Sequence, residues 1–361
     1  MKTILNRIFT FMVICLVTCS LPGCKKDRVS PETVTTIDAI QTPNARALSG
    51  SYIVSSLVSG RTQQGSPPVS TPNVAAPFRI CSAADGTMYV TAPNAGGLLY
   101  KINPAGKVTR LPDLDSPIGI KAGANGSVYL TRMPFASHTS TIVKIDKNQV
   151  MTTLPVSVGL SNALDLAITP DSTLYIADEF NRRIVKLTKQ GIASVFAGKT
   201  GQLGLVDGQG ENARFSYPIA IRYANDGTLW VIDGDGGPIG SQTIRKITLD
   251  GKVTTFFKLS ASQHSYIQCL AVTNRDKDFQ ISPYENAFMF ITDFTSTQKN
   301  QLFHLSYKKV LTPITDLLPD GFRNGDAAQA TFFSPSGITV NPRGIFVADQ
   351  GNNAIRKITK K

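Results

Sequence analysis

The chain has 361 residues and a formal net charge of +12; 42% of its residues are hydrophobic and 17% are charged. This balance excludes an intrinsically disordered chain, which would have too little apolar surface to form a core. A basic surface can attract nucleic acid, anionic lipid or acidic glycans. No run of Lys and Arg exceeds two residues, and no aromatic residues alternate with basic ones, which argues against a nucleic-acid partner.

Residues 1–23 have the pattern of a cleaved export signal. Lys2 and Arg7 form a basic start, residues 8–19 are mostly apolar, and Leu-Pro-Gly-Cys ends the segment at Cys24. The apolar run is too short to span a bilayer. The segment resembles a bacterial lipoprotein signal peptide, which implies cleavage before Cys24 and a lipid on its thiol; an ordinary secretory signal is the alternative. Removing residues 1–23, which carry two basic residues and no acid, lowers the net charge from +12 by 2 to +10.

Residues 24–48 are rich in Thr, Ser, Pro and Ala and show neither helical nor strand periodicity. This composition predicts a flexible tether behind the lipidated Cys24. Lys25 takes the place of the Asp that retains enterobacterial lipoproteins at the inner membrane, and the Lys25-Lys26-Asp27 stretch resembles the start of Bacteroidetes lipoproteins. We therefore predict a lipid-anchored protein of the outer membrane, on either its periplasmic or its surface-exposed side.

One arrangement then recurs along the chain. An apolar strand leads through a turn into a strand with an aromatic residue, a polar loop follows, and a third and a fourth strand complete the copy. The aromatic residues lie roughly 40 to 60 residues apart, as in the blades of a propeller. They are Tyr89, Tyr129, Tyr175, Trp230, Phe290 and Phe346. Six copies predict an all-β fold, a six-bladed β-propeller formed by residues 49–361 as one domain.

The sixth copy ends at Lys361 without a fourth strand, which would leave an open sheet edge. Residues 51–60 have the same pattern as residues 192–198, the fourth strand of the third copy. We therefore predict that the last blade is closed by the N-terminal strand.

The best-formed copies also share a motif. The sixth carries Pro-Ser-Gly-Ile at 335–338, Val-Ala-Asp at 347–349, Asn-Asn at 352–353 and Ile-Arg-Lys-Ile at 355–358. The third copy has Ile-Ala-Asp at 176–178 and Asn-Arg at 181–182. This spacing resembles the NHL repeat, and the chain from residue 51 to 361 resembles an NHL-repeat β-propeller lipoprotein of the Bacteroidetes type. The first and fifth copies match weakly.

Four aspartates recur at the end of the aromatic strand: Asp178, Asp233, Asp293 and Asp349. An Asp that opens a turn typically accepts hydrogen bonds from backbone N–H groups. We expect these residues to bond the turns they open rather than to form a carboxylate cluster, so that each Asp→Ala substitution costs on the order of 1 kcal/mol.

No cofactor or metal is predicted. The stretch from Asp233 to Gly237 resembles the start of a calcium loop, but Ile244 stands where a bidentate Glu belongs. The histidines, His138, His264 and His304, show no metal-ligand spacing. Neither G-x-S-x-G nor H-E-x-x-H occurs.

Cys81 and Cys269 remain after removal of the signal and modification of Cys24. They occupy matching places on the first strands of two copies that are not neighbours in a ring of six. We therefore predict two buried free thiols rather than a disulfide.

In a propeller, the loops between the second and third strands and the connectors between blades emerge on one face. The longest insertions here are of these two kinds, which makes that face the expected ligand-binding surface. Its candidate residues are Arg132, His138, Glu179, Arg182, Asp235, His264 and Arg323.

The favoured function is a non-catalytic binding or scaffold module for a glycan, peptide or protein. The alternative is a lactonase- or lyase-type enzyme with its site at the channel mouth, because six-bladed relatives include gluconolactonase-type lactonases and streptogramin lyases. No residue matches their catalytic motifs, so the sequence predicts no catalytic residue.

Overall fold

The computed structural model describes residues 52–59, 74–134, 139–234, 242–259, 265–274, 287–295 and 299–361. Strands dominate these residues, with single-turn 3₁₀ helices between some of them. In the described part of the chain, no helix is long and apolar enough to cross a membrane.

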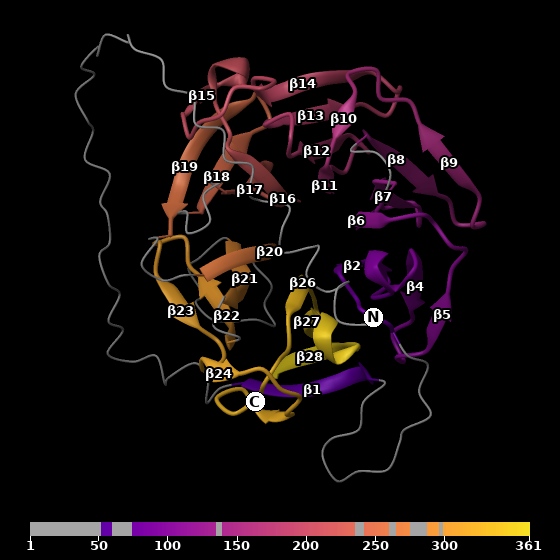
Figure 1. Ribbon diagram of the computed structural model, residues 1–361, viewed down its shortest axis with the longest axis vertical. Helices are drawn as coiled ribbons and strands as arrows, with labels where there is room; N and C mark the ends of the chain where they lie inside the picture. Colours follow the sequence, from indigo (N-terminus) through magenta and orange to yellow (C-terminus); the bar gives the residue numbers. More distant parts are fainter. Residues whose placement is uncertain are drawn as a thin grey trace, which may run out of the picture.

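Six antiparallel sheets stand around a common axis, as Figure 1 shows. The first blade contains β2 (Arg79–Ser82), β3 (Met88–Ala92), β4 (Leu98–Ile102) and β5 (Val108–Arg110). The second contains β6 (Pro117–Ala122), β7 (Val128–Arg132), β8 (Thr139–Ile145), β9 (Met151–Leu154) and the short β10 (Leu160–Ser161). The third contains β11 (Ala163–Ile168), β12 (Leu174–Asp178), β13 (Arg183–Leu187) and β14 (Ala193–Gly198).

The remaining blades follow the same order. The fourth contains β16 (Tyr217–Tyr223), β17 (Thr228–Gly234), β18 (Thr243–Thr248), β19 (Lys252–Lys258) and the short β15 (Gly208–Gln209). The fifth contains β20 (Ser265–Asn274), β21 (Ala287–Thr295), β22 (Lys299–Leu305), β23 (Leu311–Pro313) and the short β24 (Leu318–Pro319). The sixth contains β26 (Pro335–Asn341), β27 (Gly344–Asp349), β28 (Ala354–Lys360), β1 (Tyr52–Ser59) and the short β25 (Gly325–Asp326). The predicted all-β, six-bladed propeller is thus confirmed.

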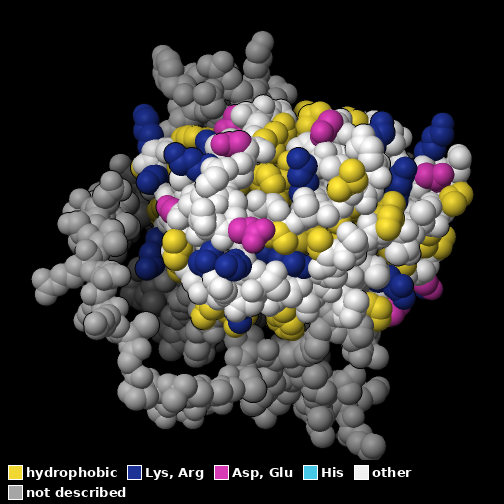
Figure 2. Space-filling model, turned by 90° about the horizontal axis from the view of Figure 1, so that it is seen from above, with side chains coloured by type: hydrophobic (Ala, Val, Ile, Leu, Met, Phe, Trp, Pro, Cys, Tyr) yellow, Lys and Arg dark blue, Asp and Glu magenta, His cyan; other side chains and the backbone are white. Residues whose placement is uncertain are grey.

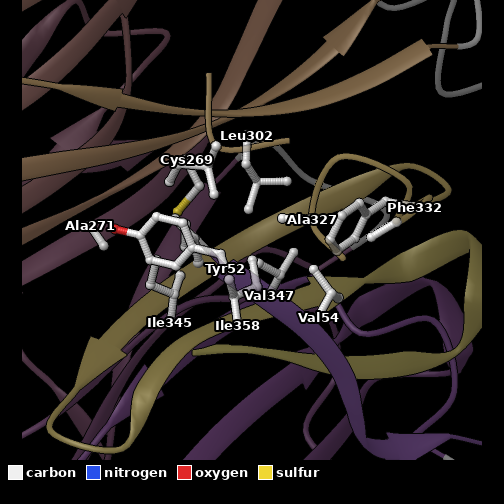
Figure 3. Packing of buried hydrophobic residues seen from close by; sticks show 13 residues of the cluster. Tyr52, Val54, Cys269, Ala271, Leu302, Ala327, Phe332, Ile345, Val347 and Ile358 are labelled. Carbon is white, nitrogen blue, oxygen red and sulfur yellow. The ribbon is translucent and has the colours of Figure 1, made fainter. Parts of the chain in front are cut away.

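The predicted closure of the ring is also confirmed. β1 pairs antiparallel with β28, with Tyr52 opposite Lys360 and Ser59 opposite Ala354. The buried side chains of Tyr52 and Val54 pack into the core between the fifth and sixth blades, where Figure 3 shows the Tyr52 ring close to Ala271. A bulge between Ser56 and Val58 reverses the side of the sheet to which the following side chains point. Val58 therefore packs against the first blade instead. One strand therefore joins three blades.

The innermost strands, β2, β6, β11, β16, β20 and β26, contact one another in that order around the ring. Two glycines let them approach closely. A Cβ at Gly337 would lie 2.5 Å from the carbonyl oxygen of Phe78, and one at Gly119 would lie 2.7 Å from the Cα of Asp165. Larger residues at these two positions would force neighbouring blades apart.

Because the strands of each blade alternate in direction, the molecule has two different faces. We call one the loop face; it carries the loops between second and third strands, such as residues 179–182, and the connectors between blades, such as residues 111–116. We call the other the turn face; it carries the turns that join first to second and third to fourth strands, such as residues 83–87 and 188–192. The predicted ligand-binding residues belong to the loop face.

Candidate functional site at the loop face

The loop face is held from beneath by buried Asp–Arg pairs, which the sixth blade illustrates. Asp349 accepts hydrogen bonds from the backbone N–H of Phe333 at 2.7 Å and from NH1 of Arg356 at 2.8 Å. Arg356 donates further to the carbonyl oxygens of Thr331 and Arg323, at 2.8 and 2.7 Å. Both charged side chains are fully buried. The pair therefore fixes the connector that leads into this blade.

The third and fourth blades repeat this arrangement. Asp178 pairs with Arg183 at 2.8 Å, and Asp233 pairs with Arg245 at 3.1 Å. Arg183 also donates to the carbonyl oxygens of Val158 and Gly159, while Arg245 donates to those of Val206 and Arg214. Each pair thus holds a connector of the loop face in place.

The aspartates accept hydrogen bonds from backbone N–H groups, as expected, but the donors are not the ones expected. Asp178 accepts from the N–H of Ser161, and Asp233 from those of Ser216 and Tyr217, so the backbone donors lie on the connector before the blade rather than in the turn that follows. The arginine partners were missed. An Arg is the third residue of the third strand in the fourth and sixth blades, as Arg245 and Arg356, and the first residue of that strand in the third blade, as Arg183.

Two of the predicted site residues meet between the third and fourth blades. They lie beside the loop-face end of the ring's axis, which we call the channel mouth, although charged side chains fill the centre beneath it. Arg182 donates from NH1 to the carbonyl oxygen of Ser216 at 2.9 Å, and its guanidinium lies 4.6 Å from the centre of the Tyr217 ring. Glu179 accepts a hydrogen bond from Nδ2 of Asn162. Asn162 and Tyr217 stand at the loop-face ends of innermost strands β11 and β16. We call Asn162, Glu179, Arg182 and Tyr217 the mouth cluster.

Burial raises the pKa of Glu179 to about 8, and the Asn162 hydrogen bond and the Arg182 charge offset this only in part. The carboxyl is therefore largely protonated at neutral pH. A group that titrates near neutral pH beside a channel mouth has the proton affinity that general acid–base catalysis requires.

We predict that Glu179→Gln makes the free energy of unfolding less sensitive to rising pH. The folded-state pKa of about 8 lies above the ordinary value of 4.5, so the folded wild type keeps a proton that the unfolded chain releases. Its free energy of unfolding therefore falls as pH rises from about 4.5 to 8, whereas Gln stays neutral and still offers an oxygen to Asn162. Urea unfolding should give equal stability at the low end of this range and a more stable variant at the high end.

Glu211→Gln, a change at an exposed position of the connector before the fourth blade, is the control. It should follow the wild type at every pH. If Glu179→Gln also did so, the carboxyl at position 179 would not be the protonated group described here.

The other predicted residues do not join the mouth cluster. Arg132 lies in the second blade, where its Nε donates to the carbonyl oxygen of Asp115 at 3.3 Å and its NH2 lies 3.5 Å from the Asp115 carboxylate. Arg323 is exposed on the connector before the sixth blade. Three candidates of the loop face and the lipidation site lie outside the described residues: His138, Asp235, His264 and Cys24.

A second group of charged residues, not predicted from the sequence, fills the centre of the ring. Asp165 is completely buried; it accepts a hydrogen bond from NH1 of Arg222 and lies 3.4 Å from Nζ of Lys121. NH2 of Arg222 lies 2.8 Å from the Cys269 sulfur. Burial alone would raise the pKa of Asp165, but the charges of Arg222 and Lys121 hold it below its usual value. These contacts tie together innermost strands of the second to fifth blades.

Arg79 of the first blade extends this network to the sixth. Its NH1 donates to the carbonyl oxygen of Gln268 in the fifth blade at 2.8 Å and to that of Ser336 in the sixth at 2.7 Å. A sequence signal exists in retrospect: a single charged residue stands in the otherwise apolar first strand of four blades, as Arg79, Lys121, Asp165 and Arg222.

The predicted free thiols are confirmed: Cys81 and Cys269 are both buried and unbridged. Burial raises the pKa of Cys81 to about 11, despite the charges of Lys121 and Arg222 nearby. A thiol rather than a thiolate is therefore present at neutral pH.

Among the described residues, no group of three or more His, Cys, Asp and Glu side chains is placed to hold a metal ion. His304 lies in β22, where burial lowers its pKa to about 4. A cavity of 460 Å³ opens on the turn face, lined by residues 82–86 and 340–343 with Asn225 and Val272 among its other neighbours. The loop face itself offers a surface of fixed loops. Figure 2 looks onto the outer edge of the ring, where basic side chains are spread among acidic and hydrophobic ones.

No protein-family model matches this sequence, and no curated protein is significantly similar to it. Solved structures with the same fold are known. Virginiamycin B lyase from Staphylococcus aureus is 16% identical, with a TM-score of 0.54, covering 85% of this chain and 99% of that one. A gluconolactonase from Xanthomonas campestris is 12% identical, with a TM-score of 0.55, covering 80% and 88%. A chain of a nidogen/laminin complex is 13% identical, with a TM-score of 0.51, covering 74% and 86%.

These likenesses agree with the six sheets described above in defining the class: this protein is a six-bladed β-propeller. At such low identity they define the fold and nothing more specific.

Proposed function

We propose that this protein is a lipid-anchored NHL-type propeller that acts as a non-catalytic binding or scaffold module at the outer membrane. Its ligand is a glycan, peptide or protein that engages the loop face. The observation that carries this proposal is the set of three buried Asp–Arg pairs beneath that face. They fix the connectors before any ligand arrives, and a surface ordered in advance loses less conformational entropy on binding.

The mouth cluster supplies the contact chemistry for such a ligand. Tyr217 presents an aromatic ring already stacked with the Arg182 guanidinium, and both side chains are partly exposed. Tyr and Arg are the residue types that most often carry binding energy at interfaces, and an aromatic ring with adjacent hydrogen-bond donors also suits a sugar or a peptide.

Glycan and peptide arrays probed with the mature protein test this proposal. We expect selective binding that Arg182→Ala or Tyr217→Ala weakens at least about tenfold, the loss typical of a hot-spot residue. Lys189→Ala, at an exposed position of the turn face, is the matched control and should bind as the wild type does. Loss of binding in the control, with binding intact in the loop-face variants, would transfer the ligand site to the turn face.

The anchor is tested separately by labelling cells with radioactive palmitate. The wild-type chain should incorporate label, and Cys24→Ser should not. Equal labelling of both would mean that this thiol does not carry the lipid.

A second function, a lactonase- or lyase-type enzyme, is favoured by one observation: Glu179, with a pKa raised to about 8, lies at the channel mouth. Such a carboxyl can donate or accept a proton near neutral pH. Turnover of lactone substrates that Glu179→Gln abolishes, while the fold is retained, would support the enzyme over the binding module.

A further inference from the structure

The turns between third and fourth strands share one backbone geometry. They span residues 103–107, 146–150, 188–192, 248–252 and 306–310. The fourth residue of each has a positive φ, from 64° at Lys309 to 94° at Gly251. In the turn of the third blade, the N–H of Thr188 donates to the carbonyl oxygen of Ile192 at 2.9 Å, and that of Ser306 donates to Val310 at the same distance in the fifth. The same residues of each turn therefore point out from the outer edge of the turn face.

This outer edge is rich in lysine. The five turns and the end of β28 carry eight exposed lysines: Lys107, Lys147, Lys189, Lys252, Lys308, Lys309, Lys360 and Lys361. The same segments carry two acids, Asp146 and Asp250, and Asp326 of the adjacent β25 pairs with Lys361 at 2.7 Å. The turns nearer the axis carry Asp85, Asp171 and Asp226, and Asp226 lies 3.6 Å from the amine of Lys246. Positive charge is thus concentrated at the rim.

Aliphatic side chains accompany the lysines. Among the described residues, nine large hydrophobic side chains are exposed, and five of them lie at this edge. Each blade from the second to the sixth contributes one: Val150 (57% exposed), Ile192 (65%), Leu249 (41%), Val310 (50%) and Ile53 (41%). Single exposed hydrophobic residues are common, but Val150, Ile192 and Val310 recur at the last position of their turns, and Leu249 and Ile53 lie at the same edge, so aliphatic and basic groups share it.

The chain also enters the propeller at this edge. Tyr52 opens β1 opposite Lys360, at the turn-face end of the sixth blade. Residues 24–51 precede it and lead back to Cys24, the proposed site of the lipid. Because the tether joins the propeller on the turn face, an anchored Cys24 holds that face nearer to the membrane than the loop face and raises its effective concentration there.

We propose that the outer edge of the turn face docks on an anionic membrane surface, with lysines against phosphate-bearing headgroups and the aliphatic side chains in the interface. This inference rests on the proposed lipid anchor, which brings the edge to the bilayer. Each lysine near an anionic surface strengthens binding about fivefold, and aliphatic side chains at the headgroup boundary add to that attraction. Docking of this kind directs the loop face, with its ligand site, away from the membrane.

Co-sedimentation with lipid vesicles tests the proposal. The chain from residue 25 to 361 lacks the lipid but keeps every described strand, and unfolding curves establish that each variant is folded. We expect binding to phosphatidylcholine vesicles that contain phosphatidylglycerol, weakened by salt, and little binding to phosphatidylcholine alone. Lys147→Glu with Lys189→Glu should lower the partition coefficient by about 30-fold or more.

The matched control is Lys199→Glu with Lys258→Glu, which makes the same change in net charge at exposed positions at the loop-face ends of β14 and β19. It should bind nearly as the wild type does. Val150→Ser with Ile192→Ser should retain the response to salt but bind more weakly at high salt, where the aliphatic contribution remains.

Equal losses in the two lysine pairs, or equal binding to both kinds of vesicle, would overturn the docking surface. Because the vesicle assay uses protein without a lipid, its failure would leave the anchor and the ligand-binding role intact. Failure of palmitate labelling would in turn remove the anchor without changing the vesicle result.

Discussion

Replacing Arg356 with Met should destabilise the propeller by about 3–5 kcal/mol, the cost of leaving one member of a buried ion pair without its partner. Met has a similar length and preserves apolar packing, but the buried Asp349 carboxyl loses its charged partner, and the carbonyl oxygens of Thr331 and Arg323 lose their donors. Urea unfolding of the wild type and the variant measures the difference.

Arg110→Met is the control, because Arg110 pairs with Asp113 at 2.8 Å with both side chains more than half exposed. Exposed pairs of this kind contribute less than about 1 kcal/mol. The double variant Asp349→Asn with Arg356→Met should recover part of the loss, since no buried charge remains. If Arg356→Met cost no more than Arg110→Met, the Asp–Arg pairs would not be what holds the connectors.

Tyr52→Ala should destabilise the protein by a similar amount, about 3–5 kcal/mol, because it removes a large buried ring and leaves a cavity. Tyr52 is 1% exposed and packs between the fifth and sixth blades on the strand that closes the ring. The urea midpoint should fall, and β1 should become the segment most easily cut by protease in the folded protein.

Ile53→Ala, at the adjacent position, is the control. Ile53 is 41% exposed and points away from that core, so the expected change is within about 0.5 kcal/mol. Equal effects at positions 52 and 53 would contradict the alternation by which β1 joins the last blade.

The repeating parts of this fold could be predicted from the sequence. The aromatic second strands and the turns around them recur at a blade-like spacing, and each copy contains its own local signals. The similarity between residues 51–60 and residues 192–198 was enough to predict the closing strand, now observed as β1 beside β28.

Contacts between copies were harder to predict. The carboxylate of Asp165 meets Lys121 and Arg222, which are 44 and 57 residues away in the sequence. Local patterns fix which residues form a strand, whereas the partners of Asp165 meet only once six blades stand in a circle. The buried arginines were missed for a different reason: Arg183 and Arg356 lie only 5 and 7 residues from their Asp partners, but a strand pattern does not mark an Arg as buried.

At the loop face, the prediction found Glu179 and Arg182 because loop position alone places them there. It did not find Asn162, which lies in the short link between β10 and β11, or Tyr217, which opens β16 and has the pattern of an ordinary strand residue. Whether a strand end borders the channel mouth depends on the tertiary arrangement of neighbouring blades.

The strand that closes the ring has a consequence for biosynthesis. Ser55 of β1 hydrogen-bonds to Lys357 of β28, 302 residues later. The first described strand to be synthesised must therefore wait for almost the last, and contacts between such distant segments form slowly. Until β28 has been synthesised, the sixth sheet lacks its third strand and β1 has no partner strand. The nearly complete chain is therefore the species that chaperones would have to protect from aggregation.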